Sequence, residues 1–242
     1  MRALTASEII HLWETAYRFH PIDQALSILQ QAMPGHTREQ LAAMSLGQRD
    51  DLLLALRQLT FGDTLPGKDT CPHCNERVEF ALSCTALSVD TPEPKRRQLV
   101  TDGFDVTVRP LTSFDLGAAA NASTVDEARS LLLERCVDEV LYQGVPTPVQ
   151  ALPQSIQNSI AETALATDPQ AEKVLELSCP ACKNEWQSLL DIGHVLWMEI
   201  CAWAQRLLLE VHQLATAYGW TEDEILKLGP VRRATYLQMV AP

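Results

Sequence analysis

Two Cys-x-x-Cys motifs are the residues of this chain whose types and spacing could support metal chemistry. They occupy residues 71–74 and 179–182, and each has Pro directly after its first Cys. Because Pro fixes its own φ and biases the preceding residue toward extended geometry, each motif is predicted to enter a restrained turn. Together they supply four thiolates, the number that a closed tetrahedral zinc site requires. We therefore predict that Cys71, Cys74, Cys179 and Cys182 bind one structural zinc ion.

The residues after the two motifs match each other. Val78 and Leu82 follow Cys74 by four and eight positions, and Trp186 and Leu190 follow Cys182 at the same spacing. Each motif therefore resembles a metal-binding turn that leads into a short strand, which is one half of a zinc ribbon.

Two other interpretations are a disulfide within each motif and a thioredoxin-like redox site. The seven cysteines are an odd number, and no secretory signal peptide is recognisable, so a reducing cytoplasmic compartment is expected, where such motifs more often bind metal. A redox motif would lie where a strand meets a helix, whereas strand-like residues follow both motifs here. His73 is expected to be a bystander. Cys84, Cys136 and Cys201 are expected to be small buried apolar residues.

The composition of the chain limits which classes of partner it can bind. The 242 residues include 19 Lys and Arg against 31 Asp and Glu, a formal charge of −12, and 46% are hydrophobic. Nucleic-acid binding depends on cationic side chains, so this charge argues against a nucleic-acid partner. The longest apolar stretch, residues 192–209, is interrupted by charged and polar residues, so no membrane span is predicted.

Residues 1–70 are predicted to form an N-terminal helical region. Ser7 is expected to cap a first helix, and a second runs over 22–33. Thr37 and Gln40 form a capping box for a third, which Gly47 separates from a fourth. The first half of the split zinc ribbon then occupies residues 71–84.

Residues 85–174 are predicted to be an inserted small lobe of mixed α/β structure. Its expected elements, in chain order, are a polar loop over 92–97, a strand over 104–108, helices starting near Ser113 or Asp115 and at Thr124, a turn over 144–148 and a helix over 154–166. Glu134, Asp138 and Glu139 are placed on one helix. Residues 175–191 return as the second half of the ribbon, so that zinc would close the base of the insertion.

Residues 192–242 are predicted to form a long helix over 192–218 and a terminal helix. Gly219 is placed to end the first, and Thr221 with Glu224 forms a capping box for the second. The apolar stripe of the long helix either completes the core or partly docks on a partner.

The predicted fold class is therefore mainly α with small β elements (α+β), a helical bundle stapled by a split zinc ribbon with an inserted lobe. No nucleotide-binding loop, nucleophile elbow or zinc-protease motif is present. A zinc ion held by four thiolates has no open coordination position with which to activate water. The sequence therefore predicts a non-enzyme with no catalytic residues and no cofactor other than structural zinc.

Three stretches carry a resemblance to a known family. They are Trp13-Glu14 through 20–26; Arg49-Asp50 through Leu56-Arg57, Phe61-Gly62 and the first Cys motif; and Trp197 through Trp203-Ala204, Leu207-Leu208, 210–212, 217–220 and Arg232-Arg233. In these stretches the chain resembles small proteins of phage-tail-like contractile injection systems that are related to the baseplate hub assembly chaperones of contractile-tailed phages. Residues 218–225 also resemble the ends of tail assembly chaperones.

The resemblance implies a cytoplasmic, non-catalytic assembly factor whose partners are baseplate, hub or other tail proteins. Its alternatives are a structural baseplate subunit retained in the particle and a zinc-ribbon regulatory protein. Only the four cysteines transfer as site residues, and the oligomeric state stays open.

Overall fold

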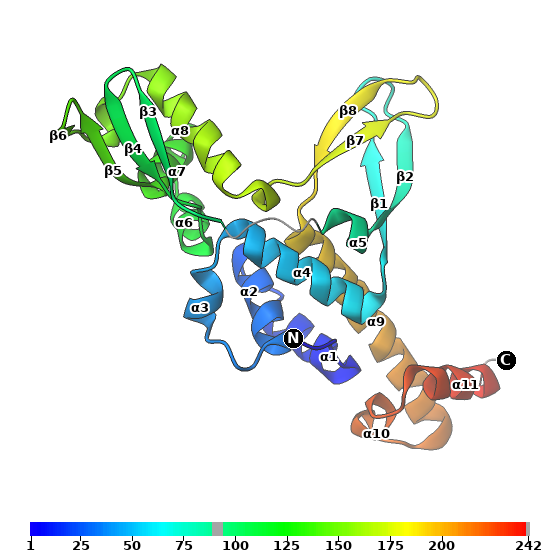
Figure 1. The fold of residues 1–242 in the computed structure, drawn as a ribbon. Coiled ribbons are helices and arrows are strands. Elements are labelled where there is room, and N and C mark those ends of the chain that lie inside the picture. The colour runs from blue at the N-terminus through cyan, green and yellow to red at the C-terminus, as the bar shows by residue number, and fades with distance from the viewer. Residues whose placement is uncertain (89–93, 241–242) are drawn as a thin grey trace. The chain divides into compact units, whose positions relative to one another are not determined.

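The structure is a computed structural model that describes residues 1–88 and 94–240 (Figure 1). The chain divides into two compact units, one formed by Met1–Gly35 with Gly193–Pro242 and the other by His36–Ile192. Mainly α structure with small β elements confirms the predicted fold class. The four-part division of the sequence stays a prediction.

The first unit is helical. Its elements are α1 (Ala6–Ala16), α2 (Pro21–Ala32), nearly all of α9 (Ile192–Tyr218), α10 (Glu222–Leu226) and α11 (Pro230–Val240). Thr5 rather than Ser7 caps α1, because Thr5 and Glu8 form a reciprocal capping box and Ser7 already lies inside the helix. His20 caps α2, and Pro21 occupies its first turn, where the missing N–H costs nothing.

Helix α9 has the predicted bounds. Gly219 follows it at φ 68° and donates its N–H to Ala215 O at 2.8 Å, which ends the helix. The predicted capping box of Thr221 and Glu224 then starts α10. Much of the stripe belongs to the core, because Leu196, Ile200, Leu207 and Leu214 are buried, as is Trp197, whereas Trp203 and Val211 are half-buried and Tyr218 is exposed.

In the described part of the second unit, helices are joined to three small sheets. Its helices are α3 (Arg38–Ala42), α4 (Leu46–Phe61), α5 (Cys84–Leu87), α6 (Ser113–Ala119), α7 (Val125–Cys136) and α8 (Gln154–Thr167), with 3-10 turns η1 (Val149–Ala151) and η2 (Pro169–Ala171). Its strands are β1 (Thr64–Thr70) and β2 (Arg77–Ser83), then β3 (Arg97–Thr101), β4 (Phe104–Val108), β5 (Val137–Tyr142) and β6 (Val145–Pro146), then β7 (Val174–Ser178) and β8 (Glu185–Leu189). Every strand pair is antiparallel, in the sheet orders β1-β2, β3-β4-β5-β6 and β7-β8.

Three local expectations are wrong. Gly47 lies inside α4 rather than before it, because Ser45 caps that helix with Gln48 in a capping box. Residues 64–70, expected within the helical region, form β1. Asp138 and Glu139 lie on β5 rather than on the helix of Glu134, since α7 ends at Cys136 and the chain then pairs with β4.

The inserted lobe has its own core and is anchored to α4 at both ends. One face of the β3–β6 sheet packs with α7 and α8 around a cluster that includes Val106, Val140 and Ile160. At the entry, Leu46 N donates to Leu111 O at 3.0 Å. At the exit, Asp168 accepts a 2.8 Å hydrogen bond from the backbone N–H of Gly47. The start of the expected loop over 92–97 lies outside the described residues, and Arg97 begins β3.

Candidate metal centre

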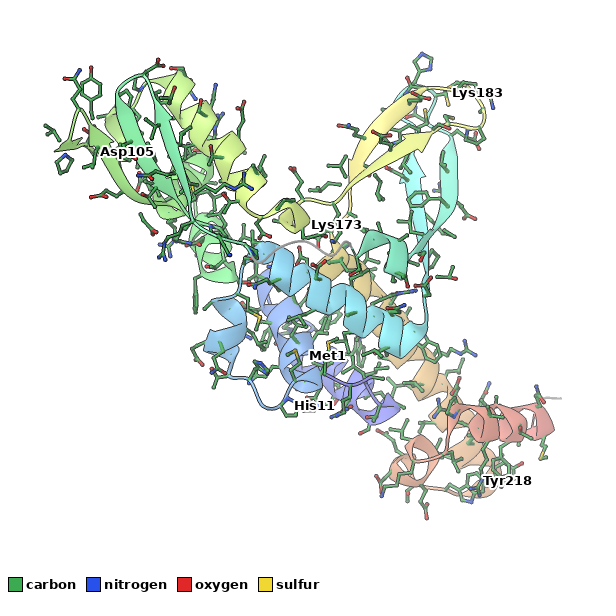
Figure 2. All side chains as sticks on the ribbon, in the orientation of Figure 1. Met1, His11, Asp105, Lys173, Lys183 and Tyr218 are labelled. Atoms are coloured by element: carbon green, nitrogen blue, oxygen red, sulfur yellow. The ribbon has the colours of Figure 1, made fainter. Side chains whose placement is uncertain are left out.

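Two β-hairpins carry the four cysteines. Cys71 directly follows β1 and Cys179 directly follows β7, so each motif forms the turn of a hairpin, β1-β2 or β7-β8 (Figure 1). Figure 2 shows Lys183 at the turn of β7-β8 and Lys173 at the opposite end of that hairpin. The strand expected after each motif is present, as β2 and β8, and the strand before the first motif, β1, was not expected.

The two turns have the same backbone geometry. In the first, Asn75 has φ 60° and donates its N–H to Cys71 O at 3.0 Å. In the second, Lys183 has φ 62° and donates to Cys179 O, also at 3.0 Å. The first Cys of each motif donates its own N–H to the carbonyl five residues later, at 2.9 Å in both turns. The two motifs thus adopt the same turn although their other residues differ. In each turn the two cysteines come to lie on the same side of the hairpin end.

The sulfur atoms form a compact cluster that fits a tetrahedral metal. All four Sγ atoms lie within 4.8 Å of one another. Between the hairpins, Cys71 Sγ lies 3.7 Å from Cys182 Sγ, and Cys74 Sγ lies 3.6 Å from Cys179 Sγ. A tetrahedron of Zn–S bonds of about 2.3 Å has S···S edges of about 3.8 Å. These two separations far exceed the roughly 2.05 Å of a disulfide, and all seven cysteines are free thiols. The four cysteines could therefore hold a metal ion.

The thiols differ in pKa when no cation is bound. Backbone hydrogen bonds from Cys182 and Ala181 lower the pKa of the Cys179 thiol to about 7. A backbone hydrogen bond at Glu76 acts to lower the pKa of Cys74, but the neighbouring cysteines outweigh it and raise that pKa to about 12. One thiolate is thus stabilised and a further one is disfavoured by its neighbours. A bound cation would supply the charge that lets all four ionise.

A side-chain hydrogen bond joins the hairpins beside the cluster. Trp186 on β8 donates its Nε1–H to Asp69 Oδ2 on β1 at 3.1 Å. Sequence reasoning used Trp186 only as a flank match and assigned no role to Asp69. No signal in the sequence pairs these positions, because they are far apart in the chain and meet only when both hairpins form.

The other candidate residues lie away from the cluster. His73 is exposed in the first turn and does not belong to the group of four. Cys84 and Cys136 are buried as expected, whereas Cys201 is only half-buried. Cys84 Sγ accepts a hydrogen bond from the buried Arg57, and Cys136 Sγ donates one to Leu133 O.

Together these observations define a helix-rich protein in which two hairpins, separated by an inserted lobe, meet at a four-cysteine cluster. A sequence model of the family described as T4 bacteriophage base plate protein matches residues 20–197. This match covers more than half of the chain, and the chain therefore belongs to that family. The matched range begins at the cap of α2, ends within α9 and contains both cysteine turns.

The other comparisons add no relative. No curated protein and no solved structure matches the chain. Over residues 1–88 and 94–240, none of the helices is both long and apolar enough to cross a membrane.

Proposed function

We propose that this protein is a cytoplasmic, non-catalytic assembly factor for the baseplate or hub of a contractile tail. Membership of the base plate family carries the proposal, since it connects the chain to baseplate proteins. The four cysteines would occupy all four positions of a tetrahedral metal ion, so the proposed metal would have no position for a substrate.

Zinc is the ion proposed for the cluster. Four thiolates are a donor set that zinc accepts in closed structural sites, and the sulfur separations match its bond lengths. The bound ion would then join the segment that precedes the inserted lobe to the segment that follows it, through Cys71, Cys74, Cys179 and Cys182. The ion would stabilise the folded state by closing a long loop at its base.

The same family description favours a second candidate, a structural subunit retained in the particle. The two are distinguished by quantitative mass spectrometry of purified particles, with sheath protein as the internal reference. An assembly factor should be absent or far below the stoichiometry of baseplate subunits, whereas a retained subunit should be present in a fixed ratio. Deletion of the gene should leave particles with defective baseplates in both cases. Normal, infective or injecting particles from the deletion strain would contradict both.

A zinc-ribbon regulator of nucleic acid remains the disfavoured alternative, since the formal charge is −12. A gel-shift with purified protein at moderate salt tests it, and retardation of DNA or RNA would support the regulator.

A further inference from the structure

An apolar groove of about 620 Å³ lies in the second unit, away from the cysteine cluster. Helices α6, α7 and α8 form much of its lining, and the end of β8 adds Leu189. Three of its lining side chains are more than half exposed, namely Val125 at 84%, Leu165 at 51% and Leu189 at 61%. The groove is therefore open enough for a segment of another protein to enter.

The apolar surface continues from the groove onto the second hairpin. Leu189 pairs with Val174 across β7-β8, and opposed residues of an antiparallel pair lie on the same face. Val174 is itself 47% exposed. Contiguous apolar surface of this kind usually marks a site of protein association on a soluble protein.

Carboxylates beside the groove favour a partner with basic side chains. Glu172 belongs to the lining, and Asp126 and Glu162 stand on α7 and α8 three residues before Arg129 and Leu165, which also line it. All three carboxylates are exposed. Two arginines of α7 are nearby cations.

Arg129 donates to the neutral Asn158 Oδ1 at 2.9 Å and keeps its charge, whereas Arg135 is paired with Asp115 at 2.8 Å. Three exposed carboxylates against one uncompensated guanidinium thus leave net negative charge beside the groove. A second copy of the chain would bring the same carboxylates to the contact, which disfavours self-association.

We propose that the groove binds an amphipathic helix of a partner protein, with the apolar row of that helix on Leu132, Leu165 and Leu189 and its flanking Lys or Arg beside Glu162 and Glu172. Helix-in-groove binding of this kind uses side chains at i, i+3, i+4 and i+7. The inference rests on the proposed function, because it names the surface with which the assembly factor would hold a tail protein.

Fluorescence anisotropy with the purified, metal-loaded full chain tests the proposal. The probe is a labelled peptide of about 18 residues, roughly five helical turns, with Leu on one face and Lys on the flanks. Two matched peptides carry Glu in place of Lys, or the same Leu and Lys in an order that destroys the apolar face. We expect the first peptide to bind with a dissociation constant below about 100 µM and the other two to bind at least tenfold more weakly.

The double variant Leu165→Gln and Leu189→Gln removes apolar surface from exposed positions and should weaken binding about tenfold or more. Val100→Gln is the matched control, since Val100 is 73% exposed on β3 and does not line the groove. It should bind like the wild type. Glu162→Gln with Glu172→Gln should weaken binding about threefold at low salt and have no effect at high salt. Unchanged thermal stability confirms that each variant is folded.

Equal binding of the three peptides, or an unaltered affinity of the double Leu variant, would overturn the proposal. So would a dimer in sedimentation that the double Leu variant dissociates, because the occupant would then be a second copy. These results leave the particle measurement unaffected. If the protein is absent from particles yet fails to bind the peptide, the proposed function stands and the proposed binding groove is wrong.

Discussion

Trp186 and Asp69 are joined by a hydrogen bond of 3.1 Å that connects β8 to β1 beside the four cysteines. Hydrogen bonds from Ser188, Thr70 and Trp186 lower the pKa of Asp69, so the carboxylate stays ionised near neutral pH. The two hairpins are thus connected by a side-chain contact as well as by the proposed metal.

Removal of the Trp186 indole N–H should weaken the contact between the two hairpins without removing a metal ligand. We expect Trp186→Phe to lower the free energy of unfolding by about 1 kcal/mol, because the ring is largely kept and one hydrogen bond is lost. Urea unfolding of metal-loaded protein measures the change. Asp69→Asn should lose at least as much, because both carboxylate oxygens accept hydrogen bonds and one of them would become an NH2 group. Loss of bound metal from Trp186→Phe would contradict this prediction.

The cysteine cluster should hold one zinc ion per chain in protein purified without added metal. Elemental analysis checks the ratio, and folded, reduced protein with almost no metal would refute the assignment. Cys179→Ser should lose the metal and melt at a markedly lower temperature, because metal-binding free energy is also folding free energy. Cys84→Ser is the matched control, since Cys84 lies outside the cluster, and it should keep the metal.

Two helical glycines should respond in opposite directions to Ala. A Cβ at Gly47 would lie 2.1 Å from Asp168 Oδ1, so Gly47→Ala must displace the side chain that accepts the Gly47 N–H. We expect a loss of about 1 to 2 kcal/mol in the free energy of unfolding. Nothing lies within 4 Å of a Cβ at Gly117 in α6, so Gly117→Ala should be neutral or stabilise by up to about 1 kcal/mol. Equal effects of the two variants in urea unfolding would contradict this account.

Asp115 should make the second unit sensitive to acid. Its side chain is buried and accepts hydrogen bonds from Arg109, Arg135 and Thr112. Burial acts to raise the pKa of Asp115, but the hydrogen bonds from Arg109 and Thr112 outweigh it and lower that pKa to about 2 from an ordinary 3.8.

Because the folded pKa lies below the unfolded one, the stabilisation is complete above about pH 4 and is lost as the pH falls toward 2. Asp115→Asn should cost about 2 kcal/mol at pH 7, less than a fully buried pair because both arginines reach solvent. The difference between wild type and variant should shrink in urea unfolding at pH 3 and below. A constant difference from pH 7 to pH 2 would show that the carboxylate charge is not the cause.

A buried ion pair should make the first unit sensitive to the loss of one charged partner. Arg233 Nε lies 2.7 Å from Glu210 Oε2, and both side chains are nearly enclosed. Glu210→Ala leaves the Arg233 charge buried and should cost about 3 kcal/mol. Asp223 and Lys227 form an exposed pair, and Asp223→Ala should leave the melting temperature unchanged. Thermal unfolding of the two variants checks the contrast, and similar shifts would contradict it.

The sequence by itself determined those features that depend on a few neighbouring residues. The bounds of α9 followed from its apolar stripe and Gly219, and the caps at Thr37, Thr124 and Thr221 followed from side chains that bond within the next helical turn. The four cysteines were found for a related reason. The two cysteines of each motif are close in the sequence, and the two motifs together supply the four ligands of a structural zinc site.

Only the tertiary structure decided the features that depend on which strand pairs with which. Strand β1 contains Pro66 and Gly67, which disfavour a strand, and it forms because β2 pairs with it. Phe80 lies opposite Gly67 and covers it so closely that a Cβ there would meet the ring at 2.1 Å. Likewise, residues 137–142 could continue the preceding helix until β4 supplies the hydrogen bonds of a strand. In each case the partner strand satisfies the backbone N–H and C=O groups, and that pairing is not readable from the segment alone.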